Sequence, residues 1–279
     1  MALNLPTFYK RLGSSIVFVA IMLTGLLWNE WAFLVLVCLV QALCLRDYFR
    51  LMQSIDKESY WPRWLPVAIQ VTGLVILIPD LFLGHLLDSS AIQWPLLLWR
   101  LMPVVPATLL LAGVLSKKSS LAATLQSIGG LFYISLPVLL LLDMRLQDLA
   151  LPLALIIMIW SNDTFAYLVG SFIGKTPFSP ISPKKTWEGT IGGVVLTMAG
   201  AALCGYFTHK FRMIDWIMLA LCATIAGTLG DMLESKLKRM ADVKDSGNLM
   251  PGHGGALDRF DSLLIAAPFA FLYVNYFMR

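Results

Sequence analysis

Acidic, basic and glycine residues gather in one stretch of the chain, between Gly230 and Asp261. Carboxylates bind hard cations such as Mg²⁺ through oxygen, whereas lysine and arginine neutralise phosphate charge. Consecutive glycines let backbone N–H groups approach phosphate oxygens closely. This combination beside apolar runs favours a site that binds a metal ion and a polyphosphate. The acids are Asp231, Glu234, Asp242, Asp245, Asp258 and Asp261, the bases are Lys236, Lys238, Arg239, Lys244 and Arg259, and three of the glycines, Gly252, Gly254 and Gly255, flank His253.

The spacing of the acids predicts their positions on two successive helices. Asp231 and Ser235 are four residues apart and share a helix face, with Glu234 close to that face. Asp258 and Asp261 stand at the start of the next apolar run. Because the loop can return the chain to the same membrane edge, we expect Asp231 and Asp258 to share one Mg²⁺, without which the two charges would repel each other. The alternative is a merely solvated loop, although lone charges at the edges of spans are costly.

A second polar motif, Ser161–Tyr167, lies inside the sixth apolar run. A charged residue at membrane depth is a candidate functional residue, because its burial is costly. Asp163, next to Asn162, could ligate a metal ion, bind a nucleotide hydroxyl or neutralise a lysine. A structural polar contact between helices is the alternative interpretation.

A third motif, Ile181–Gly189, connects two apolar runs. Its prolines predict an ordered turn rather than a helix. Ser182, Lys184 and Lys185 are its candidate phosphate-binding residues. Two lysines are also what an ordinary cytosolic loop carries, so this motif alone is weak evidence.

Of the three histidines, only His253 lies among glycines within the charged stretch. It could bind phosphate or transfer a proton, and a structural role in a turn is the alternative. His85 and His209 lie near the ends of apolar runs and are interpreted as ordinary surface residues.

The composition indicates what must position these residues. Of 279 residues, 58% are hydrophobic and only 14% are charged, with a mean hydropathy of +0.75. Such a chain cannot cover itself with a charged surface, so we predict an all-α, polytopic transmembrane helical protein. The net charge is +4, and nearly all basic residues lie in short loops between apolar runs, which points to membrane orientation rather than to a nucleic-acid partner. The four cysteines lie in apolar stretches without metal-ligand spacing, so neither a zinc site nor a disulfide framework is expected.

The apolar runs predict nine membrane spans. Residues 1–148 are expected to form an N-terminal part and residues 149–279 a C-terminal catalytic part, and the two parts are expected to form a single integral unit. The predicted spans are Leu12–Leu27, Trp31–Leu45, Trp64–Leu87, Ile92–Leu115, Leu121–Leu142, Leu149–Ile173, Gly189–Phe207, Ile214–Leu233 and Leu257–Phe277.

Lysine and arginine predict the orientation of these spans. With a cytosolic N-terminus, sixteen of them fall in inside segments and four in outside segments, and Arg100 lies within the fourth span. This is a strong positive-inside bias. The loops Gly174–Trp187 and Glu234–Leu257 are then cytosolic, and the active site is predicted at that face. The four outside residues are Arg145, Lys210, Arg212 and Arg279.

The charged stretch resembles the C-terminal signature of the phosphatidate cytidylyltransferase (CDP-diacylglycerol synthase) family. Every polar position of that signature is filled, while Met250 and Ala256 depart mildly from its bulky aliphatic positions. The motifs around Asp163 and Lys184 also resemble elements of the family. The polar and glycine positions are Ser235, Lys238, Arg239, Lys244, Asp245, His253, Gly254, Gly255, Asp258, Arg259 and Asp261.

The resemblance implies an enzyme that transfers CMP from CTP to phosphatidate in the bacterial inner membrane. It implies Mg²⁺ as the cofactor and leaves a second cation open. It implies that Asp231 and Asp258 ligate the metal. Lys244 and His253 complete the expected catalytic set. A homodimer among membrane lipids is left open. The expected substrate-binding residues are Asn162, Asp163, Ser182, Lys184, Lys185, Ser235, Lys238, Arg239, Asp245, Gly254, Gly255, Arg259 and Asp261.

Two other functions compete with this interpretation. A transporter with a midplane carboxylate at Asp163 would explain a buried acid, but not the dense charged stretch. A related enzyme with another lipid acceptor, such as an isoprenoid ether-lipid phosphate or a polyprenol, would carry similar motifs. Exchange of the lipid acceptor in a CTP assay separates these alternatives.

Overall fold

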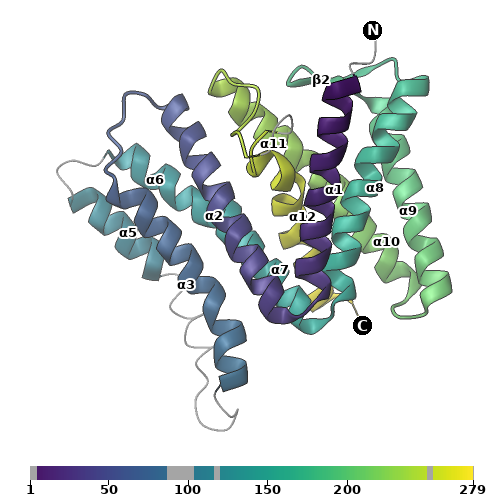
Figure 1. Cartoon of the computed structure of the whole chain (residues 1–279), viewed down its shortest axis with the longest axis horizontal. Coiled ribbons are helices and arrows are strands. Elements are labelled where there is room, and N and C mark those ends of the chain that lie inside the picture. Colours follow the sequence, from purple (N-terminus) through teal and green to yellow (C-terminus); the bar gives the residue numbers. More distant parts are fainter. Residues whose placement is uncertain (1–4, 87–103, 116–119, 250–253, 279) are drawn as a thin grey trace. The chain divides into compact units, whose positions relative to one another are not determined.

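The computed structural model describes residues 5–86, 104–115, 120–249 and 254–278, and this part of the chain is almost entirely helical (Figure 1). The predicted all-α class is confirmed, with one short hairpin added. The helices are α1 (Leu5–Leu27), α2 (Glu30–Ile55), α3 (Trp64–Leu86), α5 (Val104–Leu115), α6 (Leu121–Gly130), α7 (Leu136–Gln147), α8 (Ala150–Ile173), α9 (Trp187–Thr208), α10 (Met213–Leu221), α11 (Gly227–Met240) and α12 (Leu257–Tyr276). Two π-helical segments, η1 (Leu131–Ser135) and η2 (Cys222–Ala226), join α6 to α7 and α10 to α11.

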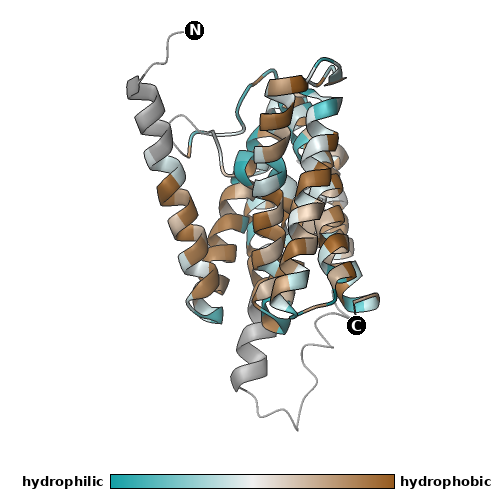
Figure 2. Ribbon diagram, turned by 90° about the vertical axis from the view of Figure 1, so that its right-hand side faces the viewer, coloured by the Kyte–Doolittle hydropathy of each residue, from teal (hydrophilic) through white to brown (hydrophobic). Residues whose placement is uncertain are grey.

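Within the described residues, five helices are long and apolar enough to cross a membrane. Hydrophobic residues predominate along the helices, and hydrophilic residues are more frequent near the helix ends and connections (Figure 2). The chain is therefore an integral membrane protein. Each of the nine predicted spans contains a helix among the described residues, but the number of crossings stays a prediction. The five helices are Glu30–Ile55, Leu121–Gln147, Ala150–Ile173, Trp187–Thr208 and Met213–Met240.

Two predicted loops begin later than expected, because the helices before them continue. The helix predicted to end at Leu45 extends to Ile55, since no glycine or proline interrupts it and Tyr48 and Phe49 remain buried. The helix predicted to end at Leu233 extends to Met240. Lys236, Lys238 and Arg239 are therefore helical residues and not loop residues.

Contacts divide the chain into two compact units. Unit 1 contains Met1–Leu146 and Met240–Asp258, and unit 2 contains Gln147–Arg239 and Arg259–Arg279. The first division lies close to the predicted division at 148. The segment Met240–Asp258 groups with the N-terminal half, although the sequence placed it in the C-terminal part.

In unit 1, α2 packs against α1, α3 and α6 around an apolar core. Asn29 caps α2, because its Oδ1 accepts a hydrogen bond of 2.7 Å from the Ala32 N–H. One buried polar contact crosses this core, from Gln41 Nε2 to Ser135 Oγ at 3.1 Å. The fully buried apolar side chains include Leu26, Phe33, Leu45, Leu65, Ile69, Leu77 and Leu142.

In unit 2, α8 and α9 approach closely through small residues. The buried residues of α9 recur at every fourth position, which places them on one helix face. A Cβ atom on Gly193 would lie 2.9 Å from both the Ala166 Cβ and the Asn162 carbonyl oxygen, so a side chain does not fit there. Small residues that let backbones approach are typical of helix packing in membranes. The buried residues of α9 are Gly189, Gly193, Thr197, Ala201 and Gly205.

The turn between α8 and α9 is a β-hairpin, formed by β1 (Pro177–Ser179) and β2 (Ser182–Thr186). The strands are antiparallel, with Pro177 opposite Thr186 and Ser179 opposite Ser182. Thr186 caps α9, because its Oγ1 accepts a hydrogen bond of 3.1 Å from the Gly189 N–H. The Glu188 carboxylate accepts hydrogen bonds from the backbone of residues 175 and 176. The predicted ordered turn is thus confirmed, and the hairpin projects from the ends of two helices.

Candidate metal and nucleotide site

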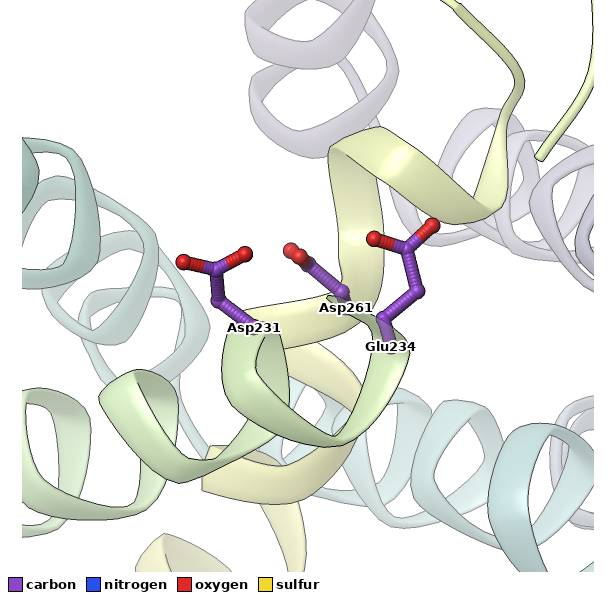
Figure 3. Close-up of side chains that lie close together, drawn as sticks. All are labelled: Asp231, Glu234 and Asp261. Atoms are coloured by element: carbon purple, nitrogen blue, oxygen red, sulfur yellow. The ribbon is translucent and has the colours of Figure 1, made fainter. Parts of the chain in front are cut away.

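Three carboxylates of unit 2 face one another, Asp231 and Glu234 from α11 and Asp261 from α12 (Figure 3). One oxygen atom from each lies within 4.8 Å of the other two. Glu234 is fully buried and Asp261 is 8% exposed. Buried carboxylates at this separation need positive charge between or beside them.

A close approach of α11 to α12 brings these acids together. Asp231 and Glu234 are one helix turn apart, so they point to the same side of α11. Gly230 contacts the other helix, where a Cβ atom would overlap the Asp261 carbonyl oxygen and lie 3.1 Å from the Ile265 Cβ. The absence of a side chain at Gly230 thus allows Asp261 to reach the acids of α11.

Two lysines of unit 2 pair with this cluster. Lys238 donates to Glu234 Oε2 at 2.5 Å, one turn further along α11. Lys185 of β2 forms an ion pair with Asp231, so the hairpin reaches the cluster. When all three carboxylates are ionised, these five groups together carry one net negative charge, which an added cation would compensate.

Two of the predicted residues surround Asp231. Ser235 Oγ lies 3.4 Å from Asp231 Oδ1, as their spacing on the helix predicted. Asp163 of α8 interacts electrostatically with both Lys185 and Asp231. The sixth apolar run, the hairpin and α11 therefore contribute charges to one region of unit 2, as three separate sequence motifs suggested.

Asn162 differs from its neighbour Asp163, because it is buried where α8 meets α9. Its Oδ1 atom has no hydrogen-bond partner within the described part of the chain, and a Cβ atom on Gly193 would lie 3.0 Å from it. A contact between helices accounts for this position. A substrate-binding role for Asn162 stays a prediction.

Several predicted phosphate-binding residues are accessible to solvent. Lys184 lies on β2, where Ser182 is the first residue, and Arg239 lies in the last turn of α11. Lys244 and Asp245 are exposed on the segment that follows α11, and Arg259 is exposed in the first turn of α12. Exposure is compatible with substrate binding, and these roles stay predictions.

Asp258 has a different environment, within unit 1. Its Oδ2 atom accepts three hydrogen bonds, from the Ser246 N–H and Oγ at 2.8 Å each and from the Gly255 N–H at 2.7 Å. Gly254 has a φ of +81°, and a Cβ atom there would lie 2.6 Å from Asp258 Oδ2. Both constraints favour glycine at this position. Asp258 thus stabilises the loop that joins α11 to α12 and carries the family signature, referred to below as the signature loop. That Asp258 shares a Mg²⁺ with Asp231 stays a prediction.

The predictions for Met250, Gly252 and His253 concern residues outside the described part of the chain. Two carboxylates that the structure makes prominent, Glu234 and Asp47, are absent from the site residues that the sequence predicts. The spacing of Glu234 from Asp231 on one helix face is a signal that could have placed it in the site. Asp47 of α2 contacts the signature loop across most of the chain length, and no local sequence signal indicates that contact.

Comparison with known proteins supports these motifs. The model of the cytidylyltransferase family matches residues 9–277. The chain is 30% identical to the phosphatidate cytidylyltransferase of Synechocystis sp. over 97% of both proteins. It is 45% identical to the enzyme of that name from Bacillus subtilis, over 43% of this chain and 46% of that protein. The match to the Staphylococcus aureus enzyme, at 41% identity, also spans about half of each chain, namely 49% and 53%.

The site and these matches together identify both the class of protein and its family. An integral membrane protein in which three carboxylates converge beside two lysines is consistent with a nucleotidyltransferase that acts on lipid. The chain belongs to the cytidylyltransferase family, and the resemblance inferred from the signature is confirmed.

Proposed function

We propose that this membrane enzyme forms CDP-diacylglycerol from CTP and phosphatidate, and that the cluster of Asp231, Glu234 and Asp261 holds the Mg²⁺ on which the reaction depends. The activity is supported by the family match and by the full-length relative. The metal proposal is carried by one observation, the convergence of three carboxylates within 4.8 Å. Carboxylate oxygens are the ligands that Mg²⁺ prefers, so the donor set fits this ion. The number of cations stays open.

The reaction joins a phosphate oxygen of phosphatidate to the α-phosphorus of CTP. The bond from that phosphorus to the β-phosphate oxygen breaks, and pyrophosphate leaves. Phosphatidate is anionic near neutral pH, so no strong general base is required. A bound Mg²⁺ would supply positive charge to phosphate oxygens.

The protein's own residues orient the substrates and neutralise their charge. Asp231, hydrogen-bonded by Ser235, and the pair of Glu234 with Lys238 form a preorganised polar region along α11. Lys184 and Lys185 on the hairpin, with Arg239 on α11, are proposed to bind the phosphate groups of CTP. Lys244, Asp245 and Arg259 are proposed to contact substrate from the signature loop and the start of α12.

We further propose that this site faces the cytosol in the bacterial inner membrane, with the N-terminus inside. The loop charges support this orientation, sixteen inside and four outside. Unit 2 is consistent with it. Lys185 of the hairpin pairs with Asp231, whereas Lys210, which the charge bias predicts to lie outside, pairs with Asp148 before α8 at 2.7 Å. Phosphatidate would then meet CTP at the cytosolic surface, and a homodimer among membrane lipids stays a prediction.

Purified protein, supplied with CTP and phosphatidate in lipid vesicles, tests the activity. We expect CDP-diacylglycerol and pyrophosphate in equal amounts, with turnover lost in excess EDTA and restored by Mg²⁺. Replacement of phosphatidate by a polyprenol or an isoprenoid ether-lipid phosphate should abolish turnover. Preference for one of those acceptors would refute the proposed substrate, and solute flux without CTP consumption would indicate a transporter.

Cysteine labelling tests the orientation separately. A single cysteine at Pro180, in the exposed turn of the hairpin, is introduced after Cys38, Cys44, Cys204 and Cys222 are replaced by serine. A membrane-impermeant maleimide should label this cysteine only from the cytosolic side. Labelling from the periplasmic side of intact cells would contradict the orientation and leave the activity unaffected.

A further inference from the structure

Asp47 of α2 contacts the signature loop although it is distant in sequence. Its Oδ2 atom accepts a hydrogen bond of 2.6 Å from the Ala256 N–H, 209 residues away, and a longer one of 3.4 Å from the Leu257 N–H. Asp47 is 5% exposed. Both partners belong to the same unit as Asp47, and they immediately precede Asp258. A carboxylate on backbone N–H groups at a helix start is a charge-assisted contact, favoured by the helix dipole.

The loop is shaped around this carboxylate. A Cβ atom on Gly247 would lie 2.6 Å from Asp47 Oδ1, and one on Gly255 would overlap Asp47 Oδ2. Two glycines from opposite ends of the described loop thus leave room for one side chain. In the His–Gly–Gly signature, Gly255 is therefore required because a side chain there would collide with Asp47, and Gly254 because a side chain there would collide with Asp258.

Consecutive backbone groups connect the two carboxylates. The Gly255 N–H donates to Asp258 Oδ2, and the next N–H, that of Ala256, donates to Asp47 Oδ2. Ser246, adjacent to Gly247, also donates to Asp258. A movement of the loop away from Asp47 would therefore move the groups that hold Asp258.

We propose that Asp47 is a positioning residue for the transfer reaction, which fixes the signature loop and thereby the placement of Asp258. It acts through the backbone of Ala256 and Leu257 and does not itself touch substrate. The inference rests on the proposed transferase activity, but not on the proposed metal cluster. A residue with this role should affect turnover more than folding or lipid binding, because the loop is misplaced while the helices remain assembled.

The test compares Asp47→Asn and Asp47→Ala with a matched control, Asp56→Asn. Asn keeps one oxygen that can accept the Ala256 N–H, whereas Ala keeps none. Asp56 follows the same helix and also accepts hydrogen bonds, from the Ser59 N–H at 3.1 Å and Gln126 Nε2 at 3.3 Å. Its partners lie outside the signature loop. The measurements are kcat, KM for CTP and for phosphatidate, the melting temperature in detergent, and hydrogen exchange of peptides that cover residues 244–258.

We expect Asp47→Ala to lower kcat at least about tenfold, with little change in KM for phosphatidate, since the loss of a charged hydrogen-bond partner is worth one or more factors of ten. Asp47→Asn should lie between it and the wild type. Exchange should rise at Ala256 and Leu257 in both variants, and Asp56→Asn should behave as the wild type.

Wild-type kcat and exchange in Asp47→Ala would overturn the proposal. So would a loss of folded protein in both Asp47 variants, because that result would assign Asp47 to general stability. If wild-type protein makes no CDP-diacylglycerol, the proposed activity fails, and the exchange measurement still decides whether Asp47 holds the loop.

Discussion

The protein has two groups of carboxylates that look alike in sequence and differ in their surroundings. Asp231, Glu234 and Asp261 in unit 2 face one another, with Lys185 and Lys238 beside them. Asp47 and Asp258 in unit 1 instead accept hydrogen bonds from the backbone of one loop. The carboxylates of the first group point toward one another, whereas those of the second group accept hydrogen bonds from backbone N–H groups.

This difference shows that an acidic residue in a signature does not by itself indicate a metal ligand. Backbone N–H groups can stabilise a carboxylate without any ion, so Asp258 has a structural reason for its identity. The acids of unit 2 have a weaker structural reason, because burial of facing anions is unfavourable unless a cation compensates them. We therefore expect substitutions in the first group to weaken metal binding, and substitutions in the second group to increase the mobility of the loop.

The largest effect is expected from Asp231→Asn. The variant should lose activity at least about 100-fold and bind Mn²⁺, a spectroscopic substitute for Mg²⁺, at least about tenfold more weakly. Activity and Mn²⁺ electron paramagnetic resonance, recorded without CTP, measure the two losses. Asp261→Asn should behave in the same way. Asp148→Asn, whose partner Lys210 lies in another part of unit 2, is the control and should keep both properties. Normal Mn²⁺ binding in Asp231→Asn would remove the cluster as the metal site.

Asp258→Asn decides whether the two groups meet at one ion. The sequence prediction of a shared Mg²⁺ requires this variant to lose activity about 100-fold and to bind Mn²⁺ more weakly, while the protein remains folded and inserted. Asp242→Asn and Asp245→Asn, in the exposed loop, should change Mn²⁺ binding less. Loss of activity with unchanged Mn²⁺ affinity and faster exchange of the loop would contradict shared ligation and assign Asp258 to loop structure alone.

Arg239→Lys examines whether α11 supplies a phosphate ligand in addition to metal ligands. Lysine keeps the charge but loses the planar fork that binds two phosphate oxygens. Because hydrogen bonds to charged groups are worth about 1.5–3 kcal/mol, we expect activity to fall roughly tenfold or more, with Mn²⁺ affinity unchanged. Steady-state kinetics with varied CTP provide the measurement. Full activity in this variant would remove Arg239 from the site.

Gly230→Ala should have the smallest effect on chemistry and a measurable one on stability. The added methyl group would meet the Asp261 backbone and push α11 away from α12. Overpacking of this kind costs about 1–3 kcal/mol, so the melting temperature in detergent should fall, and activity should fall severalfold. Gly200→Ala is the matched control, because a Cβ atom on Gly200 of α9 meets no atom within 4 Å. Equal melting temperatures for the two variants would show that the close approach at Gly230 is unimportant.

Much of the fold followed from the sequence. Apolar runs of sufficient length predicted the membrane helices. Lipid offers no hydrogen-bond partners, so the backbone N–H and C=O groups of a spanning segment must pair with one another, as they do in a helix. Proline residues predicted the turn between α8 and α9, and the spacing of Asp231, Glu234 and Ser235 predicted their shared helix face. These features depend on residues close together in the chain, and the sequence records such local relations directly.

Helix ends were predicted less well. The apolar runs end before charged residues such as Arg46 and Lys236 and therefore predict the ends of α2 and α11 too early. A helix can continue past the apolar run when no breaker follows, and burial of Tyr48 and the pairing of Glu234 with Lys238 stabilise that continuation. The limit of a hydrophobic span is therefore not the limit of its helix.

The family, and with it the lipid substrate, could be inferred from the signature between Ser235 and Asp261, since that pattern of charges and glycines is long and specific. Which acids face one another could not. Asp261 joins Asp231 because Gly230 lets two helices meet, and Asp47 reaches Ala256 across 209 residues because α2 and the loop fold into the same unit. By itself, the sequence determined the kind of chemistry and the helices that carry it. Only the tertiary structure decided the environment of each carboxylate, because that environment depends on contacts between residues far apart in the chain.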